Sequence, residues 1–201
     1  MGNQTTHNAT GMTHIDIPTS LTGHLLIAMP NLADPNFSGT VSLICEHSES
    51  GAMGLVINHP TEITMAEVFE QMNVEGGEEQ RGQLVLSGGP VSLDRGFILH
   101  SSGDGDWESS LQITDDLVLT ASADIVRAMA SEKPPNPALM FLGYAGWGAG
   151  QLEEEIQQNS WLTTPATTDI IFNAPFAERV KLAVEAAGVN FGRLSGGAGR
   201  A

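Results

Sequence analysis

The chain alternates short apolar runs with polar stretches rich in glycine, proline, asparagine and aspartate. Short apolar runs that end at such turn residues are typical of buried strands. The turn signals also indicate that 40–45 pairs with 54–58 as a hairpin, and 111–113 with 117–120. The pattern predicts strands over residues 25–30, 40–45, 54–58, 84–90, 96–100, 111–113, 117–120, 138–143 and 169–172.

Helical signals separate several of these runs. Thr64-Met-Ala-Glu67 matches a capping box, and the apolar residues after it recur at helical spacing as far as Met72. Ser122 is a favourable N-cap for a helix over 123–131, which must stop before two prolines. Further helices are expected over 151–159 and 175–188.

These elements predict an α/β fold. Strands alternate with helices, but several neighbouring strands are joined by hairpins, which favours a mixed sheet over a purely parallel one. We expect a single domain, with a mixed, largely hairpin-linked sheet and helices packed on its faces in a three-layer, sandwich-like arrangement. A length of 201 residues suits one domain. Its expected bounds are 21–194, with a flexible amino-terminal tail over 1–20 and a carboxy-terminal tail over 195–201.

The charge balance narrows the choice of partners. Asp and Glu number 24 and Lys and Arg number 8, so the formal charge is −16 at pH 7. Nucleic-acid binding depends largely on Lys and Arg that displace counterions from phosphates, and anionic membranes attract the same residues. The composition therefore disfavours nucleic acid and membrane surfaces as partners.

The cysteine content and the amino terminus indicate the cytoplasm. Cys45 is the single cysteine, so no disulfide can form within the chain, as is usual in a reducing compartment. No apolar run approaches the roughly 18 residues that span a bilayer. Residues 1–19 lack both the basic and the apolar regions of a secretory signal.

Cys45 and His47 form the first candidate site. Side chains two residues apart in a strand project to the same face, and a histidine beside a thiol can lower its pKa. The pair could therefore supply a nucleophile or a redox-sensitive thiolate. The alternative is a buried structural cysteine at the end of a strand, and the nearby Glu46 and Glu49 would oppose a thiolate.

A glycine-rich run over 143–150 forms the second candidate, at the expected junction of a strand with a helix. Backbone N–H groups in such a junction can bind a ligand. The run matches no common phosphate-binding motif, contains no Lys or Arg and precedes the glutamates at 153–155, so its ligand would be neutral or weakly anionic. The alternative is a tight structural turn. The candidate ligand-binding residues are Gly143, Tyr144, Gly146, Trp147, Gly148 and Gly150.

The third candidate is a second glycine-rich turn. Gly88, Gly89 and Pro90 demand unusual backbone angles, and Arg95 could hold a carboxylate ligand through its guanidinium group. The alternative for Asp94 and Arg95 is a capped turn with a surface ion pair.

The sequence supports no metal site and indicates no cofactor. The six histidines include no pair at the spacing that holds zinc on a helix, and one cysteine cannot build a thiolate cluster. No serine lies in the nucleophile motif of the α/β-hydrolases.

Several of these segments together resemble the YqgE/AlgH family of bacterial proteins. His59 stands where that family usually has arginine, and Arg200 stands where it usually has histidine. The resemblance covers residues 21–201 and rests on LLIAMPNLADPNF at 25–37, SLICEHSESGAMGLVIN at 42–58, LSGGPVSLDRGFILH at 86–100, GYAGWGAGQLEEE at 143–155, NSWL at 159–162 and LSGGAGR at 194–200.

The resemblance implies a compact mixed α/β domain in the bacterial cytosol, and little about activity. The family has no settled catalytic set, and some members are labelled transcriptional regulators. Residues that match its recurring motifs are candidates for one shared cleft. They are Cys45, Glu46, His47, Gly88, Gly89, Pro90, Asp94, Arg95 and the run 143–151.

We therefore expect a cytoplasmic regulatory protein that binds a small molecule or another protein and affects gene expression indirectly. Catalysis is left open, and its absence is favoured because no recognised catalytic set is present. The first alternative is a thiol-dependent enzyme or redox sensor that uses Cys45 with His47. The second is a direct DNA-binding regulator, which the charge and the lack of a basic recognition helix oppose. The ligand, the partner and the oligomeric state are left open.

Overall fold

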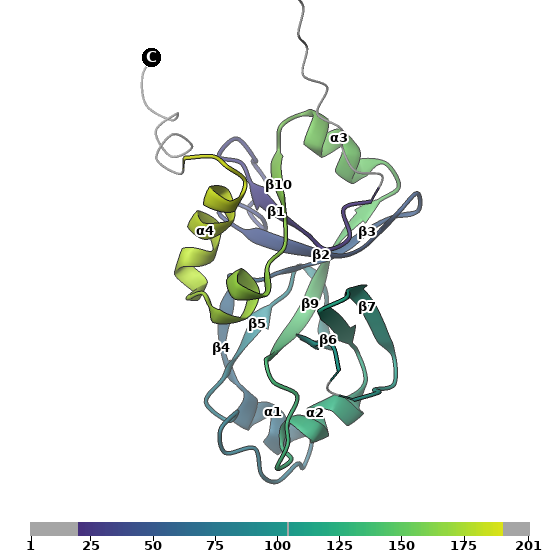
Figure 1. The fold of residues 1–201 in the computed structure, drawn as a ribbon, viewed down its shortest axis with the longest axis vertical. Coiled ribbons are helices and arrows are strands. Elements are labelled where there is room, and N and C mark those ends of the chain that lie inside the picture. Colours follow the sequence, from purple (N-terminus) through teal and green to yellow (C-terminus); the bar gives the residue numbers. More distant parts are fainter. Residues whose placement is uncertain (1–19, 104, 191–201) are drawn as a thin grey trace, which may run out of the picture.

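The computed structural model describes residues 20–103 and 105–190, so the expected tails lie outside it apart from Ser20. The strands of this part of the chain form one curled sheet (Figure 1). They are β1 (His24–Ala28), β2 (Val41–Ser48), β3 (Gly51–Val56), β4 (Pro60–Thr64), β5 (Leu84–Ser87), β6 (Val91–Ser101), β7 (Ser110–Thr114), β8 (Leu117–Thr120), β9 (Ala138–Gly148) and β10 (Trp161–Pro165).

Strand β9 joins the two halves of the sheet. The strand order is β10-β1-β2-β3-β9-β6-β8-β7, and β5, with β4 beside it, also pairs with β9. Among the described strands, the β5–β9 pairing is parallel and the others are antiparallel. The two expected hairpins are confirmed as β2–β3 and β7–β8. The prediction of a mixed, hairpin-linked α/β sheet is therefore confirmed.

Short α-helices pack around this sheet. The capping box before α1 is confirmed, because the Glu67 carboxylate accepts bonds from the Thr64 N–H (2.8 Å) and hydroxyl (3.0 Å). Figure 1 shows α3 and α4 at the end that carries β1 and β10, and α1 and α2 at the other end. The helices are α1 (Met65–Gln71), α2 (Ala123–Met129), α3 (Gln151–Gln157) and α4 (Arg179–Ala186).

Three clusters of buried side chains define the layers. Because strand residues alternate between faces, Leu25 of β1 packs in the cluster under α4, whereas Leu26 packs in the cluster under α3. In β9, Phe141 joins the cluster under α4, and Met140 joins the one under α1 and α2. The helices therefore cover both faces of the sheet.

The prediction of a strand over 169–172 is wrong. Residues 169–172 form a π-helical turn, Asp169–Asn173, which leads through a 3₁₀ turn, Phe176–Glu178, into α4. The N–H of Ile170 bonds to the Thr167 hydroxyl at 3.4 Å. A short apolar run does not by itself distinguish a strand from a helical segment, and here the local bonds favour the helical turn.

The glycine-rich run over 143–150 lies mostly within a strand, not at the expected junction of strand and helix. Strand β9 continues through Gly148, so α3 follows it almost directly. Asp94 and Arg95, expected at a turn, lie within β6. Glycine indicates a turn when only local sequence is considered, but inside a strand it marks close approach of another backbone.

Candidate functional site

Cys45 is a core residue. Its side chain is fully buried among the apolar residues of the cluster under α4, and its thiol donates to the Leu43 carbonyl at 3.7 Å. Burial raises the pKa of the Cys45 thiol above its usual range. The environment therefore opposes the thiolate that a nucleophilic or redox role requires.

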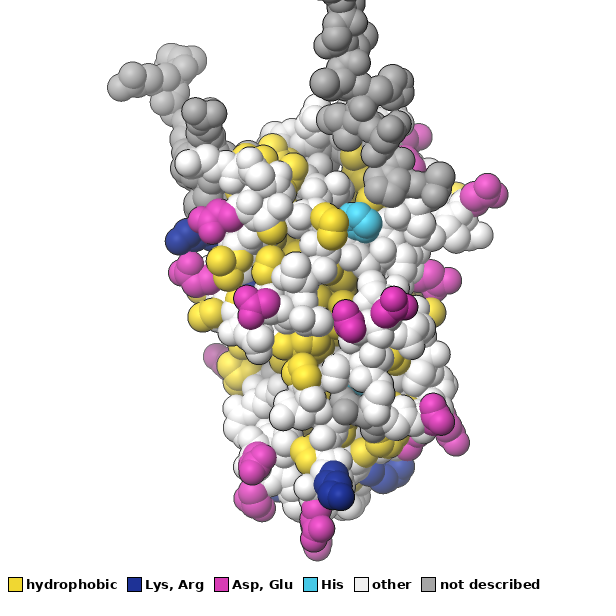
Figure 2. Space-filling model, viewed as in Figure 1, with side chains coloured by type: hydrophobic (Ala, Val, Ile, Leu, Met, Phe, Trp, Pro, Cys, Tyr) yellow, Lys and Arg dark blue, Asp and Glu magenta, His cyan; other side chains and the backbone are white. Residues whose placement is uncertain are grey.

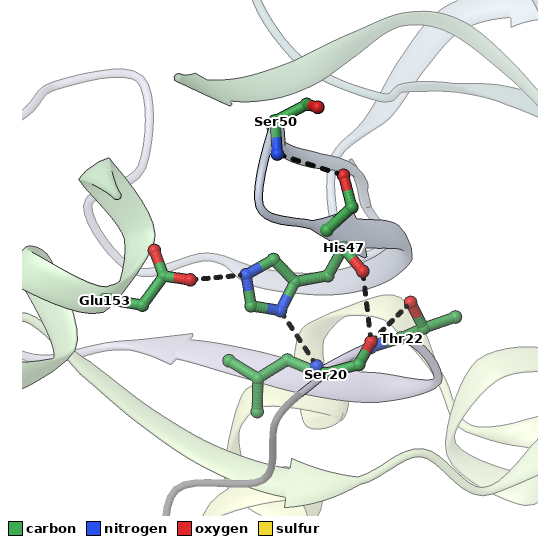
Figure 3. A network of polar contacts seen from close by, with 7 residues as sticks. Ser20, Thr22, His47, Ser50 and Glu153 are labelled. Atoms are coloured by element: carbon green, nitrogen blue, oxygen red, sulfur yellow. Dashed lines mark hydrogen bonds and ion pairs between the residues drawn. The ribbon is translucent and has the colours of Figure 1, made fainter. Parts of the chain in front are cut away.

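His47 faces α3 (Figure 3). Its Nδ1 accepts the Leu21 N–H at 2.9 Å, and its Nε2 lies 2.8 Å from Oε1 of Glu153. The histidine side chain is only 4% exposed. A register shift in the β2–β3 pairing between Ile44 and Glu46 interrupts the regular alternation at Cys45.

The structure therefore does not place Cys45 and His47 on one face as a working pair. Both ring nitrogens of His47 are already engaged, which leaves neither to take a proton from the thiol. The expectation of a shared face fails because it assumed a strand without a bulge.

The two glycine-rich segments cross at close range. A Cβ atom on Gly88 would lie 2.3 Å from the carbonyl oxygen of Gly143, and one on Gly89 would lie 2.3 Å from the carbonyl carbon of Tyr144. The Gly88 N–H bonds to the Leu142 carbonyl at 2.8 Å. These contacts leave no room for a side chain at the crossing, which supports the structural interpretation of both segments.

The aromatic residues of the glycine-rich run pack inward. Trp147 stacks on Phe37 with ring centres 5.9 Å apart and meets Trp161 edge-on at 6.0 Å. The indole N–H groups of both tryptophans donate to Oε2 of Glu155, at 3.1 and 2.7 Å. Tyr144 packs edge-on against Phe97. Glu155 is thus a structural acceptor beneath α3.

Asp94 and Arg95 are exposed and do not form the expected ion pair. The described ion pairs join His47 to Glu153, Arg81 to Glu70 and Lys181 to Glu178. The Arg95 guanidinium instead lies over the ring of Phe97, 5.1 Å from its centre.

The expected shared cleft is not formed, because the candidates divide among separate places. Cys45 lies in the core, His47 lies against α3, and the run 143–148 lies in β9. Gly89 and Pro90 line a depression of about 330 Å³ together with His59. Asp94 lines a different hollow, and none of the other candidate residues for the shared cleft lines it.

This hollow lies between α1, α2 and the sheet. It has a volume of about 300 Å³. Val68 of α1 and Met72, directly after α1, lie on one wall, Val126 of α2 lies on another, and β6 and β9 supply the floor. Its lining residues are Ile63, Glu67, Val68, Gln71, Met72, Asp94, Gly96, Phe97, Ile98, Thr120, Ala121, Ser122, Ala123, Val126, Met140 and Leu142.

The charged groups of the hollow are acidic. Glu67 and Asp94 contribute carboxylates, and none of the described lining residues is a Lys, Arg or His. The Thr120 hydroxyl is already bonded to His100, and the Ser122 hydroxyl to the Glu108 carbonyl. The sequence indicated Asp94 as a candidate residue of a cleft, and Glu67 and Ser122 only as helix caps.

Most of the described chain matches a known protein family. A family model described as AlgH-like, DUF179, matches residues 25–192. The chain belongs to the AlgH-like family. The family resemblance inferred from the motifs is therefore confirmed.

Relatives match this AlgH-like chain over most of their length. A UPF0301 protein of Saccharophagus degradans is 49% identical over 182 residues, covering 90% of this chain and 89% of the relative. A UPF0301 protein of Azoarcus sp. is 49% identical over 183 residues, covering 90% and 97%. The names of these relatives state no ligand and no reaction.

Solved structures show the same fold. The solution structure of the AlgH protein from Pseudomonas aeruginosa is 45% identical, with a TM-score of 0.75, and the match covers 92% of this chain and 98% of that one. A crystal structure of a Corynebacterium diphtheriae protein is 22% identical with a TM-score of 0.61, covering 80% and 83%. The second likeness shows the fold alone.

Two further observations concern the described residues only. No group of three or more His, Cys, Asp and Glu side chains there could hold a metal ion. None of the helices in residues 20–103 and 105–190 is long and apolar enough to cross a membrane.

Proposed function

We propose that this AlgH-like protein is a cytoplasmic regulatory protein that binds a small ligand in the hollow between α1 and α2. The observation that carries the proposal is an apolar hollow with open carboxylates. Small-molecule sites are typically concave and mostly apolar, with a few polar groups, and they occupy about 300–1,000 Å³. The hollow, at about 300 Å³, lies at the lower end of that range.

The walls suit an adaptable binding site. Met72 and Met140 line it from opposite elements, and methionine side chains change shape at low energetic cost. Gly96 lies on the floor, where a Cβ atom would come within 3.1 Å of the Met140 methyl group. The floor is therefore kept open partly by the absence of a side chain.

The two alternative functions receive less support from the geometry. A thiol-dependent enzyme requires an accessible, activated Cys45, whereas the thiol is buried and separate from His47. A DNA-binding regulator requires a cationic surface, whereas Figure 2 shows acidic side chains spread over the visible face and few Lys or Arg. An effect on gene expression would thus follow from ligand binding and be indirect.

A second candidate function is binding of a partner protein. Val91 and Leu93 are 37% and 62% exposed, in the part of β6 where pairing with β9 is interrupted between Val91 and Gly96. Exposed apolar side chains that lie together favour protein contacts. This function would be supported by a partner protein that the native chain captures. The Ala186→Ser variant should capture the same partner, and the Leu93→Ser variant should not.

Ligand binding can be tested with three probes that share one apolar body: phenylbutylamine, phenylbutanol and phenylbutyrate. Methyl-labelled methionine spectra should show that at least one probe shifts the Met72 and Met140 signals, each assigned through its Met→Leu variant. Ala123→Trp should abolish the shift, because exposed Ala123 lines the hollow. Ala186→Trp, at an exposed position of α4, is the matched control. Shifts absent for all three probes, or unaffected by Ala123→Trp, would refute the proposed site.

A further inference from the structure

We propose that the hollow selects organic cations, and specifically amines that carry an apolar group of about the size of a phenylbutyl chain. This inference rests on the proposed function and adds the chemical class of the ligand. It follows from the placement of two carboxylates at the edge of an apolar hollow in which no described residue supplies a balancing cation.

Glu67 can bind a ligand while it caps α1. Both bonds from Thr64 end on Oε2. Among the described residues, none donates a bond to Oε1. These bonds, first that of the Thr64 backbone, hold the pKa of Glu67 below its usual range. The carboxylate is thus fixed in position, ionised at neutral pH and open at one oxygen.

Asp94 supplies the second carboxylate from the opposite element. It is exposed on β6, and no described Lys, Arg or His forms an ion pair with it. Glu67 and Asp94 together therefore favour a ligand that brings one positive charge and several N–H donors, which is the chemistry of an ammonium group.

The amino terminus of α2 does not reverse this preference. A helix amino terminus attracts anions, but here the Asp124 carboxylate already occupies it. Asp124 accepts the Ile125 N–H at 2.8 Å and the Glu108 N–H at 3.0 Å. The bond from Ser122 is the main cause that lowers the pKa of Asp124, so this carboxylate stays ionised as well.

Arg95 is the charged group that acts against the preference. Its guanidinium lies over the ring of Phe97, which packs in the cluster under α4, and Arg95 is not a lining residue of the hollow. Its single positive charge is outnumbered by the carboxylates of Glu67 and Asp94, which do line the hollow. The net charge around the hollow is negative, as is the formal charge of the chain, −16.

The test compares the affinities of phenylbutylamine, phenylbutanol and phenylbutyrate, measured by isothermal titration and by the Met72 and Met140 methyl shifts. We expect the amine to bind about tenfold more tightly than the alcohol, and the carboxylate to bind most weakly. Added salt should reduce the preference for the amine, because the carboxylates lie at an exposed rim.

Charge-removing variants locate the source of the preference. The Glu67→Gln/Asp94→Asn double variant should bring the amine to within about twofold of the alcohol, because the neutral amides no longer favour the ammonium group over the hydroxyl. Glutamine is accepted at the third position of a capping box, so this variant keeps the cap of α1. Asp115→Asn, at an exposed turn outside the hollow, is the control for a general change of charge.

The outcomes separate the two proposals. Equal binding of amine and alcohol, or a preference that survives in the double variant, would overturn the inference and leave the ligand site standing. Loss of the preference in Asp115→Asn would also overturn it, because the effect would then come from the overall charge. Failure of all three probes to bind would overturn both proposals.

Discussion

The α3 end and the α1–α2 end of the molecule use their polar groups differently. At the α3 end, His47 bonds through both ring nitrogens, and Glu155 accepts bonds from two indoles. At the α1–α2 end, Glu67 retains a carboxylate oxygen to which no described residue donates, and exposed Asp94 has no described ion-pair partner. Groups whose bonding is already complete stabilise the fold, whereas open groups beside an apolar hollow can bind a ligand.

The most conspicuous sequence motifs have structural roles rather than forming the proposed ligand site. The cysteine, the histidine and the glycine-rich segments are the most conspicuous features of the sequence, yet they lie in the core, in structural bonds or at a backbone crossing. The hollow is lined mostly by residues outside these features, and of the candidate residues for a shared cleft only Asp94 lines it. The conspicuous local motifs and the proposed ligand site therefore largely differ in this chain.

The largest expected effect concerns the glycine crossing. Gly88→Val should destabilise the fold by about 3 kcal/mol or more, or prevent folding, because the new side chain would meet backbone atoms that cannot move away. Gly82→Ala is the matched control, since no atom lies within 4 Å of its added Cβ. Urea unfolding of both variants measures the difference, and a well-folded Gly88→Val would show that the crossing is not a structural constraint.

The next effect concerns access to Cys45. Native protein should react with iodoacetamide at least about a hundredfold more slowly than urea-unfolded protein at the same pH, because the thiol must be exposed by opening of the core. Mass spectrometry of timed samples measures the rate. Rapid labelling of the native protein would show that the Cys45 thiol is accessible. Cys45 would then again be a candidate functional residue, which would contradict its assignment to the structural core.

A smaller effect is expected at Glu155. Glu155→Ala should lower the free energy of unfolding by about 1–3 kcal/mol, because the Trp147 and Trp161 indoles lose their shared acceptor. Glu154→Ala, an exposed neighbour on α3, should change it by no more than about 0.5 kcal/mol. Equal effects of the two variants in urea titrations would argue against a structural role for Glu155.

The smallest effect is a pH dependence at Glu153. Its own backbone N–H, with a smaller contribution from His47, holds the pKa of Glu153 below its usual range. A carboxyl group with a lowered folded-state pKa stabilises the protein above its unfolded pKa, about 4.3, and this contribution is lost as the pH falls. Glu153→Gln should therefore lose less stability than the native protein between about pH 5 and pH 3. Urea midpoints across this range measure it, and parallel curves would contradict it.

Local sequence determined most of the strands, both hairpins and the cap of α1. These features depend on residues close together in the chain, such as Thr64 and Glu67, whose chemistry selects one backbone conformation. The same local reasoning failed over 143–148. This segment is a strand, and the backbone of a distant segment, Gly88–Gly89, packs directly against it.

Tertiary structure decided which residues meet. The bulge at Cys45 ended the regular alternation that would have placed it beside His47. Arg179 is 1% exposed because α4 carries it to the carbonyls of Ala174 and Ile57, and burial lowers its pKa to about 10. The hollow likewise joins α1, α2, β6 and β9, which are separated along the chain. The sequence by itself determined the elements through local bonds, and only packing of the distant elements determined the site.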